Sequence, residues 1–185
     1  MLKGALCSAL VLAALQDTGA NPDLLYKKEV GVSIMKPPKN EEWGFPEKGF
    51  WTNSQLVVAH KVDTLRIEIS YQEKPSTGYF DPKKAAEGEW TNLSGNANFK
   101  EARKNQEIKS MKLPGGGAGN VNAHVLDMWF KVNDKPTELK MYCFIGRENQ
   151  GLYKITLSGD EGMYKKHQKW ADYILSTIKT WKLPK

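Results

Sequence analysis

The sequence predicts an α+β fold, in which a central antiparallel sheet of about six strands is flanked by helices and an amphipathic C-terminal helix packs on one face. Two patterns carry this prediction. From Thr64 to Gln72, apolar side chains alternate with polar ones, as in a strand with one buried face. From Asp160 to Lys179, apolar side chains recur every three or four residues, as in a helix with one buried face. Such faces are buried by packing a helix on a sheet.

The first 20 residues have the composition of a cleavable secretory signal. Lys3 precedes an apolar run from Gly4 to Leu15, and small or polar residues follow as far as Ala20. The run is too short to span a bilayer. An N-terminal helix packed on the domain is the alternative. We therefore expect a signal peptide at 1–20, a single domain at 21–185, and export to the periplasm or the extracellular space.

The chain of 185 residues carries a formal net charge of +6. Removal of the signal leaves this charge unchanged, because Lys3 and Asp17 cancel. A basic exported protein can contact an acidic protein face, an acidic polymer or an anionic membrane surface. The lysines are dispersed along the chain in pairs, which is typical of a solvated surface. Together with export, this dispersion argues against nucleic acid as a partner.

The first half of the mature chain is expected to contain strands, an aromatic loop and one helix. Asp81 followed by Pro82 is a typical helix start, because the carboxylate caps free backbone N–H groups and proline is tolerated in the first turn. In order, we expect a strand at Glu29–Met35, a loop at Asn40–Phe50, strands at Gln55–Val62 and Thr64–Gln72 joined at Asp63, and a helix from Asp81 to about Trp90.

The second half is expected to form a strand meander closed by the amphipathic helix. A short helical piece is expected at Phe99–Arg103, followed by strands at Gln106–Leu113, Ala123–Val132, Thr137–Ile145 and Leu152–Leu157, of which the last three are joined as hairpins. The apolar stripe of the closing helix consists of Met163, His167, Trp170, Ile174, Ile178 and Trp181. We expect this stripe, together with Trp90, to lie in the core.

The order of elements and three segments resemble the PsbP-like superfamily, the α/β/α sandwich of the photosystem extrinsic subunit and its bacterial exported relatives. The segments are Gly31–Pro37 (GVSIMKP), the turn Asn149–Gly151 leading into Leu152–Ile155, and the ending from Trp170 to Lys179. The resemblance implies a binding or assembly factor without catalysis. No ligand motif of the superfamily stands in this sequence, so no functional residue is carried over.

Cys143 is the one thiol left after removal of the signal, which contains Cys7. It shares strand parity with Leu139 and Met141, so we expect a buried thiol with a raised pKa. An enzyme that uses Cys143 and His124 is retained as an alternative.

His60, His124 and His167 fall in separate elements without a second ligand at a zinc-like spacing, so we expect ordinary surface or sheet-edge histidines, no metal and no cofactor. A metal site assembled from distant positions stays open. The glycine-rich segment Gly115–Gly119 lacks the following Lys and Ser or Thr of a phosphate-binding loop, so we expect a plain inter-strand loop.

The aromatic residues around one loop give the functional prediction. Exposed aromatic rings anchor partner proteins or stack on sugars, although these rings could instead fill the space between sheet and helices. We expect an exported, non-catalytic binding or assembly factor at the cell envelope, with an envelope protein or polymer as partner. A small-ligand or carbohydrate-binding module that uses Trp43, Trp51 and Trp129 is the alternative. The candidate surface consists of Trp43, Phe45, Phe50, Trp51 and Trp129.

Overall fold

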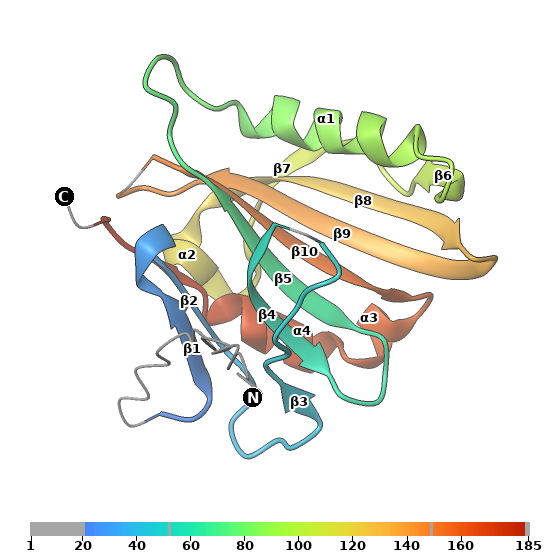
Figure 1. Ribbon diagram of the computed structural model, residues 1–185, viewed down its shortest axis with the longest axis horizontal. Coiled ribbons are helices and arrows are strands. Elements are labelled where there is room, and N and C mark those ends of the chain that lie inside the picture. Colours follow the sequence, from blue (N-terminus) through green and yellow to red (C-terminus); the bar gives the residue numbers. More distant parts are fainter. Residues whose placement is uncertain (1–20, 52, 149, 184–185) are drawn as a thin grey trace, which may run out of the picture.

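The computed structural model describes residues 21–51, 53–148 and 150–183. The predicted signal peptide lies outside these residues and stays a prediction. The described residues form an eight-stranded antiparallel sheet in the order β3-β4-β5-β10-β9-β8-β6, with β7 also paired to β8, and a three-stranded sheet in the order β1-β2-β11 (Figure 1). The strands are β1 (Leu24–Lys27), β2 (Val32–Met35), β3 (Trp43–Gly44), β4 (Ser54–His60), β5 (Arg66–Gln72), β6 (Lys100–Lys104), β7 (Lys109–Lys112), β8 (Asn122–Val132), β9 (Lys135–Ile145), β10 (Leu152–Asp160) and β11 (Lys179–Thr180).

The described residues contain fewer helices than strands, although α1 is the longest single element. The α-helices are α1 (Pro82–Ser94), α2 (Gly117–Asn120), α3 (Met163–Lys166) and α4 (Gln168–Ser176), and the 3-10 turns are Lys28–Val30 and Pro114–Gly116. The side chain of Asp81 accepts hydrogen bonds from the backbone N–H groups of Lys83 and Lys84, which confirms the predicted start of α1. No helix in the described part of the chain is both long and apolar enough to cross a membrane.

The centre of the large sheet is the predicted meander. Strands β8, β9 and β10 are consecutive antiparallel neighbours, and β5 pairs with the free side of β10. The α+β class and the antiparallel sheet are confirmed, although the sheet has eight strands rather than about six. Leu65, Ile67 and Ile69 lie in one core as the alternation predicted.

Each face of the large sheet has its own apolar core. On one face, Val32 and Ile34 of β2 and Ile174 and Leu175 of α4 are fully buried against the sheet. On the other face, Ala86 of α1 packs against apolar side chains of β8 and β9. In Figure 1, α1 lies along one side of the sheet and α4 lies with the small sheet on the other. The arrangement is a sandwich of three layers.

The N-terminal strand is shorter than predicted. Lys28–Val30 form a 3-10 turn, and Gly31 has a left-handed backbone (φ 61°), so the strand begins only at Val32. This turn lets the preceding residues fold back as β1, which pairs with β2 and was not predicted. The predicted helical piece at Phe99–Arg103 is also wrong. It is strand β6, because pairing with β8 outweighs its local helix preference.

The predicted closing helix is also corrected. Asp160 still belongs to β10, the helix is interrupted at His167 (φ −107°), and it ends at Ser176. Lys179 and Thr180 instead form β11, which pairs with β2. Ile174 and Ile178 are nevertheless fully buried, whereas Met163, His167, Trp170 and Trp181 are only partly buried, so two of the six predicted core positions are confirmed.

Candidate binding site at one end of the sheet

A cavity of about 730 Å³ opens where the β4–β5 turn, the β8–β9 hairpin and the end of β10 come together. Its volume lies within the usual range for small-ligand sites. Aromatic, cationic and acidic side chains line it: Phe50, Trp51 and Phe130 are aromatic, Lys61, Arg66 and Lys135 are cationic, and Asp63 and Asp160 are acidic. This mixture suits a guest that carries both apolar and acidic groups.

Apolar side chains at the mouth of this cavity face solvent. Phe50 is 54% exposed and Val62 is 84% exposed. Phe50 contacts Trp51 edge-on, with 4.9 Å between the ring centroids. Exposed apolar groups beside a cavity are typical of surfaces that a partner covers.

A buried carboxylate holds the aromatic loop in place. Glu68 of β5 is only 1% exposed. The backbone N–H groups of Phe50 and Trp51 donate to its two oxygens, at 2.7 and 3.2 Å, and the hydroxyl of Ser54 donates to Oε2. The polar face of β5, opposite its apolar side chains, is therefore covered at Glu68. Because charge-assisted bonds of this kind are strong, the loop that presents Phe50 is preorganised.

A cluster of His60, Asp63 and His167 adjoins the cavity. Asp63 Oδ2 lies 2.6 Å from Nε2 of His167 and 2.8 Å from Nζ of Lys166. These two hydrogen bonds, that of Lys166 first, lower the pKa of Asp63 to about 2. The Asp63 backbone N–H donates to His60 Nδ1 at 3.0 Å, and the two imidazole centroids are 4.4 Å apart. The prediction of isolated surface histidines is therefore wrong for His60 and His167.

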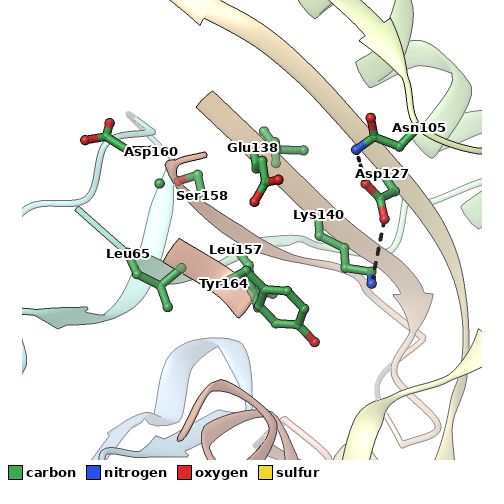
Figure 2. A pocket seen from close by; sticks show the side chains of 11 residues that line it. Leu65, Asn105, Asp127, Glu138, Lys140, Leu157, Ser158, Asp160 and Tyr164 are labelled. Atoms are coloured by element: carbon green, nitrogen blue, oxygen red, sulfur yellow. Dashed lines mark hydrogen bonds and ion pairs between the residues drawn. The ribbon is translucent and has the colours of Figure 1, made fainter. Parts of the chain in front are cut away.

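A smaller cavity, of about 170 Å³, is lined in part by Tyr164 of α3 and shares Ser158, Gly159 and Asp160 with the larger one. Figure 2 shows Asn105, Asp127 and Lys140 joined by interactions along its wall. Asn105 donates to Asp127 at 2.7 Å, and Lys140 forms an ion pair with Asp127 at 3.7 Å. Since these polar groups already satisfy one another, the larger cavity is the better candidate site.

Three of the predicted surface aromatics do not face solvent freely. Trp43 is 1% exposed, and its ring packs edge-on against His60 and His167. Phe45 packs against the same core. Trp129 is 8% exposed, and the Arg103 guanidinium lies 4.3 Å from its ring centroid. Trp43 and Trp129 are thus corrected to buried residues, because sheet and neighbouring side chains cover them.

The three tryptophans that were predicted to lie in the core are only partly buried. Trp90 and Trp170 each pack against one of the two cores, and Trp181 is half-buried. Of the predicted surface residues, Phe50 and Trp51 are the two that line the cavity.

Cys143 is fully buried on the face that α1 covers, as predicted. Burial raises the pKa of its thiol to about 12. His124 stands directly opposite it in the register of β8 and β9. A thiol with so high a pKa carries almost no thiolate at neutral pH, which is the form that attacks substrates.

No protein-family model and no curated protein matches this chain. Its fold does match solved structures. The solution structure of cyanobacterial PsbP (CyanoP) from Synechocystis sp. PCC 6803 has a TM-score of 0.57 at 12% identity, covering 88% of this chain and 96% of that one. The crystal structure of LpqN, described as involved in cell envelope biogenesis of Mycobacterium tuberculosis, has a TM-score of 0.53 at 13% identity, covering 87% and 86%.

A crystal structure from Bacteroides thetaiotaomicron VPI-5482 also matches, with a TM-score of 0.53 at 13% identity. The match covers 86% of this chain and 48% of that chain, so this chain spans about half the length of the Bacteroides protein. At identities this low, the comparisons establish the fold and leave the activity to be argued from the residues.

Proposed function

We propose that this chain, which has the PsbP-like fold, is an exported, non-catalytic binding or assembly factor of the cell envelope. It binds a partner protein by taking an acidic and apolar segment of that protein into the cavity beside Phe50. One observation supports the proposal above all. The solvent-exposed apolar side chains of Phe50 and Val62 line the same cavity as the cationic side chains of Lys61, Arg66 and Lys135.

The signal-like first 20 residues support export. LpqN, which shares the fold, is described as involved in cell envelope biogenesis, and this supports an envelope role. The buried thiol of Cys143 supports a role without nucleophilic catalysis. The net charge of +6 favours an acidic partner through long-range attraction.

Carbohydrate binding has less support from the same residues. Sugar rings are bound by stacking on exposed indoles, and the indoles of Trp43 and Trp129 are buried. Trp51 is half-buried and packs against the core beneath α1. The exposed ring at the cavity belongs to Phe50, a phenyl ring, and not to one of the three indoles on which this alternative depends.

Site-specific photo-crosslinking in intact cells tests the proposal. A benzoylphenylalanine introduced at position 50 is expected to give one discrete crosslinked protein. The matched control places the same residue at Tyr79, which is 82% exposed but does not line the cavity. Position 79 is expected to give no such product.

Charge reversal then separates a protein partner from a lipid one. Lys61→Glu with Lys135→Glu is expected to abolish the crosslink at position 50, because both cations line the cavity. Crosslinks to lipid alone, or equal protein crosslinks at positions 50 and 79, would refute the proposal.

A further inference from the structure

We propose that His60, Asp63 and His167 form a binding site for a divalent transition-metal ion, for which zinc is the best match. One ligand atom from each residue lies within 4.8 Å of the other two. The ligands are brought together from the end of β4, the β4–β5 turn and the junction of α3 with α4. A bound ion would thus join two segments that are distant in the sequence.

The separations fit the size of the ion. Asp63 Oδ2 is 2.6 Å from Nε2 of His167 and 3.9 Å from Nδ1 of His60. Zinc binds nitrogen and carboxylate oxygen at about 2.0–2.2 Å, so the ligands of a tetrahedral site stand about 3.3 Å apart. The observed distances lie on either side of this value. Side-chain movements of about 1 Å would place the three atoms around one ion.

The hydrogen bonding of His60 leaves Nδ1 as the nitrogen whose lone pair could bind a metal. Its side chain is 4% exposed, and Nδ1 accepts the N–H of Asp63, so Nε2 is the protonated nitrogen. That buried Nε2 makes no hydrogen bond within the described residues. Its nearest acidic atom is Glu42 Oε2, at 3.7 Å.

A metal on Nδ1 would leave the proton on Nε2, directed at the Glu42 carboxylate. Metal-bound histidines almost always donate their other N–H to a carboxylate, carbonyl or water. The chain therefore supplies the outer partner as well as the ligand. Glu42 is 67% exposed, so it is free to close the remaining distance.

A metal ion would displace the backbone N–H of Asp63 from His60 Nδ1 and the ammonium of Lys166 from Asp63 Oδ2. Lys166, which contacts Asp63 Oδ2, is 56% exposed and can turn into solvent. His60 and Asp63 line the large cavity, which gives an ion and its remaining water ligands a route of entry. Two imidazoles with one carboxylate favour zinc, and the related ions cobalt and nickel, over magnesium or calcium, which prefer oxygen ligands.

Metal titration of the full, untagged chain after chelator treatment tests the site. We expect one Zn²⁺ per chain by calorimetry, a Kd in the micromolar range or below, and a visible Co²⁺ absorption band of tetrahedral type. His60→Gln and His167→Gln are expected to weaken zinc binding at least about 100-fold. His124→Gln, a histidine outside the cluster, is the matched control and is expected to bind as the wild type does.

A second variant keeps the test independent of folding defects. Lys166→Ala removes an exposed ammonium that competes for Asp63, so it is expected to bind zinc at least as tightly as the wild type. Weaker binding by Lys166→Ala would contradict the site. So would an absence of Zn²⁺ binding to the wild type at about 100 µM, or binding that survives both His60→Gln and His167→Gln.

Discussion

At the scale of single residues, burial was predicted best from strand parity, the alternation of side chains between the two faces of a strand. It placed Cys143 on the core face with Leu139 and Met141, and these side chains share one apolar core. The neighbouring Lys154 on β10 forms an ion pair with Glu89 of α1, so the thiol is enclosed by helix and sheet together. The packing around this thiol keeps reagents away from it.

Cys143 is expected to be inert to thiol reagents in the folded protein. In Cys7→Ser, which leaves one thiol, the reaction with a disulfide reagent at pH 8 should be slower than that of a free thiol by at least about 1,000-fold, because burial and a pKa of about 12 suppress the thiolate. Denaturant should restore full reactivity. Rapid labelling of the native protein would contradict the enclosed position.

The contact between the histidines of the cluster could not be predicted from the sequence. His60 follows Leu56 and Val58 on the core-facing side of β4, and His167 stood within the predicted apolar stripe. Each histidine thus sat at a core-facing position, which was a usable signal. Their meeting depends on how α3 and α4 seat on the large sheet, and no local spacing encodes that contact.

At the scale of elements, the segment between β3 and β4 supplies Phe50 and Trp51 to the lining of the cavity. The alternation in β5 correctly assigned Glu68 to the face opposite Ile67 and Ile69, but it could not show that a loop covers that face. Gly49 allows this cover, since a Cβ there would lie 2.2 Å from Glu68 Oε2 and 2.8 Å from Ser54.

Two glycine-to-alanine variants are expected to change stability in opposite directions. Gly49→Ala should lower the free energy of unfolding by about 1–3 kcal/mol, because its methyl group overlaps Glu68 and Ser54. Gly88→Ala, within α1 and with nothing within 4 Å of the new methyl group, should raise it by about 0.5–1 kcal/mol. Chemical denaturation measures both. A neutral Gly49→Ala would show that the loop is not held as closely as described.

At the scale of the whole molecule, the two sheets are joined by side chains as well as by the shared core. The hydroxyl of Tyr153, on β10 of the large sheet, donates to the carbonyl of Val30 at 2.5 Å, just before β2 of the small sheet. The ring stacks on Phe144 with 5.4 Å between centroids. The sequence predicted the large sheet but not this second one, because β1 and β11 are short and gain stability only from pairing with β2.

Removing the Tyr153 hydroxyl tests this junction. Tyr153→Phe is expected to lower the free energy of unfolding by about 1–2 kcal/mol, because the Val30 carbonyl loses a buried donor. Tyr79→Phe, at an 82% exposed position, is the control and should be neutral within about 0.5 kcal/mol. Equal stability of the two variants in denaturant titrations would mean that this bond does not stabilise the junction.

Pairing of β11 with β2 also affects the order in which the chain can fold during synthesis. β2 emerges from the ribosome early, yet its neighbour on one side is the last strand of the described chain. Until that strand arrives, β2 has an open edge, and open edges recruit other chains. Completion of the small sheet is therefore a late event, and a chaperone that shields β2 in the meantime would have a defined site on which to act.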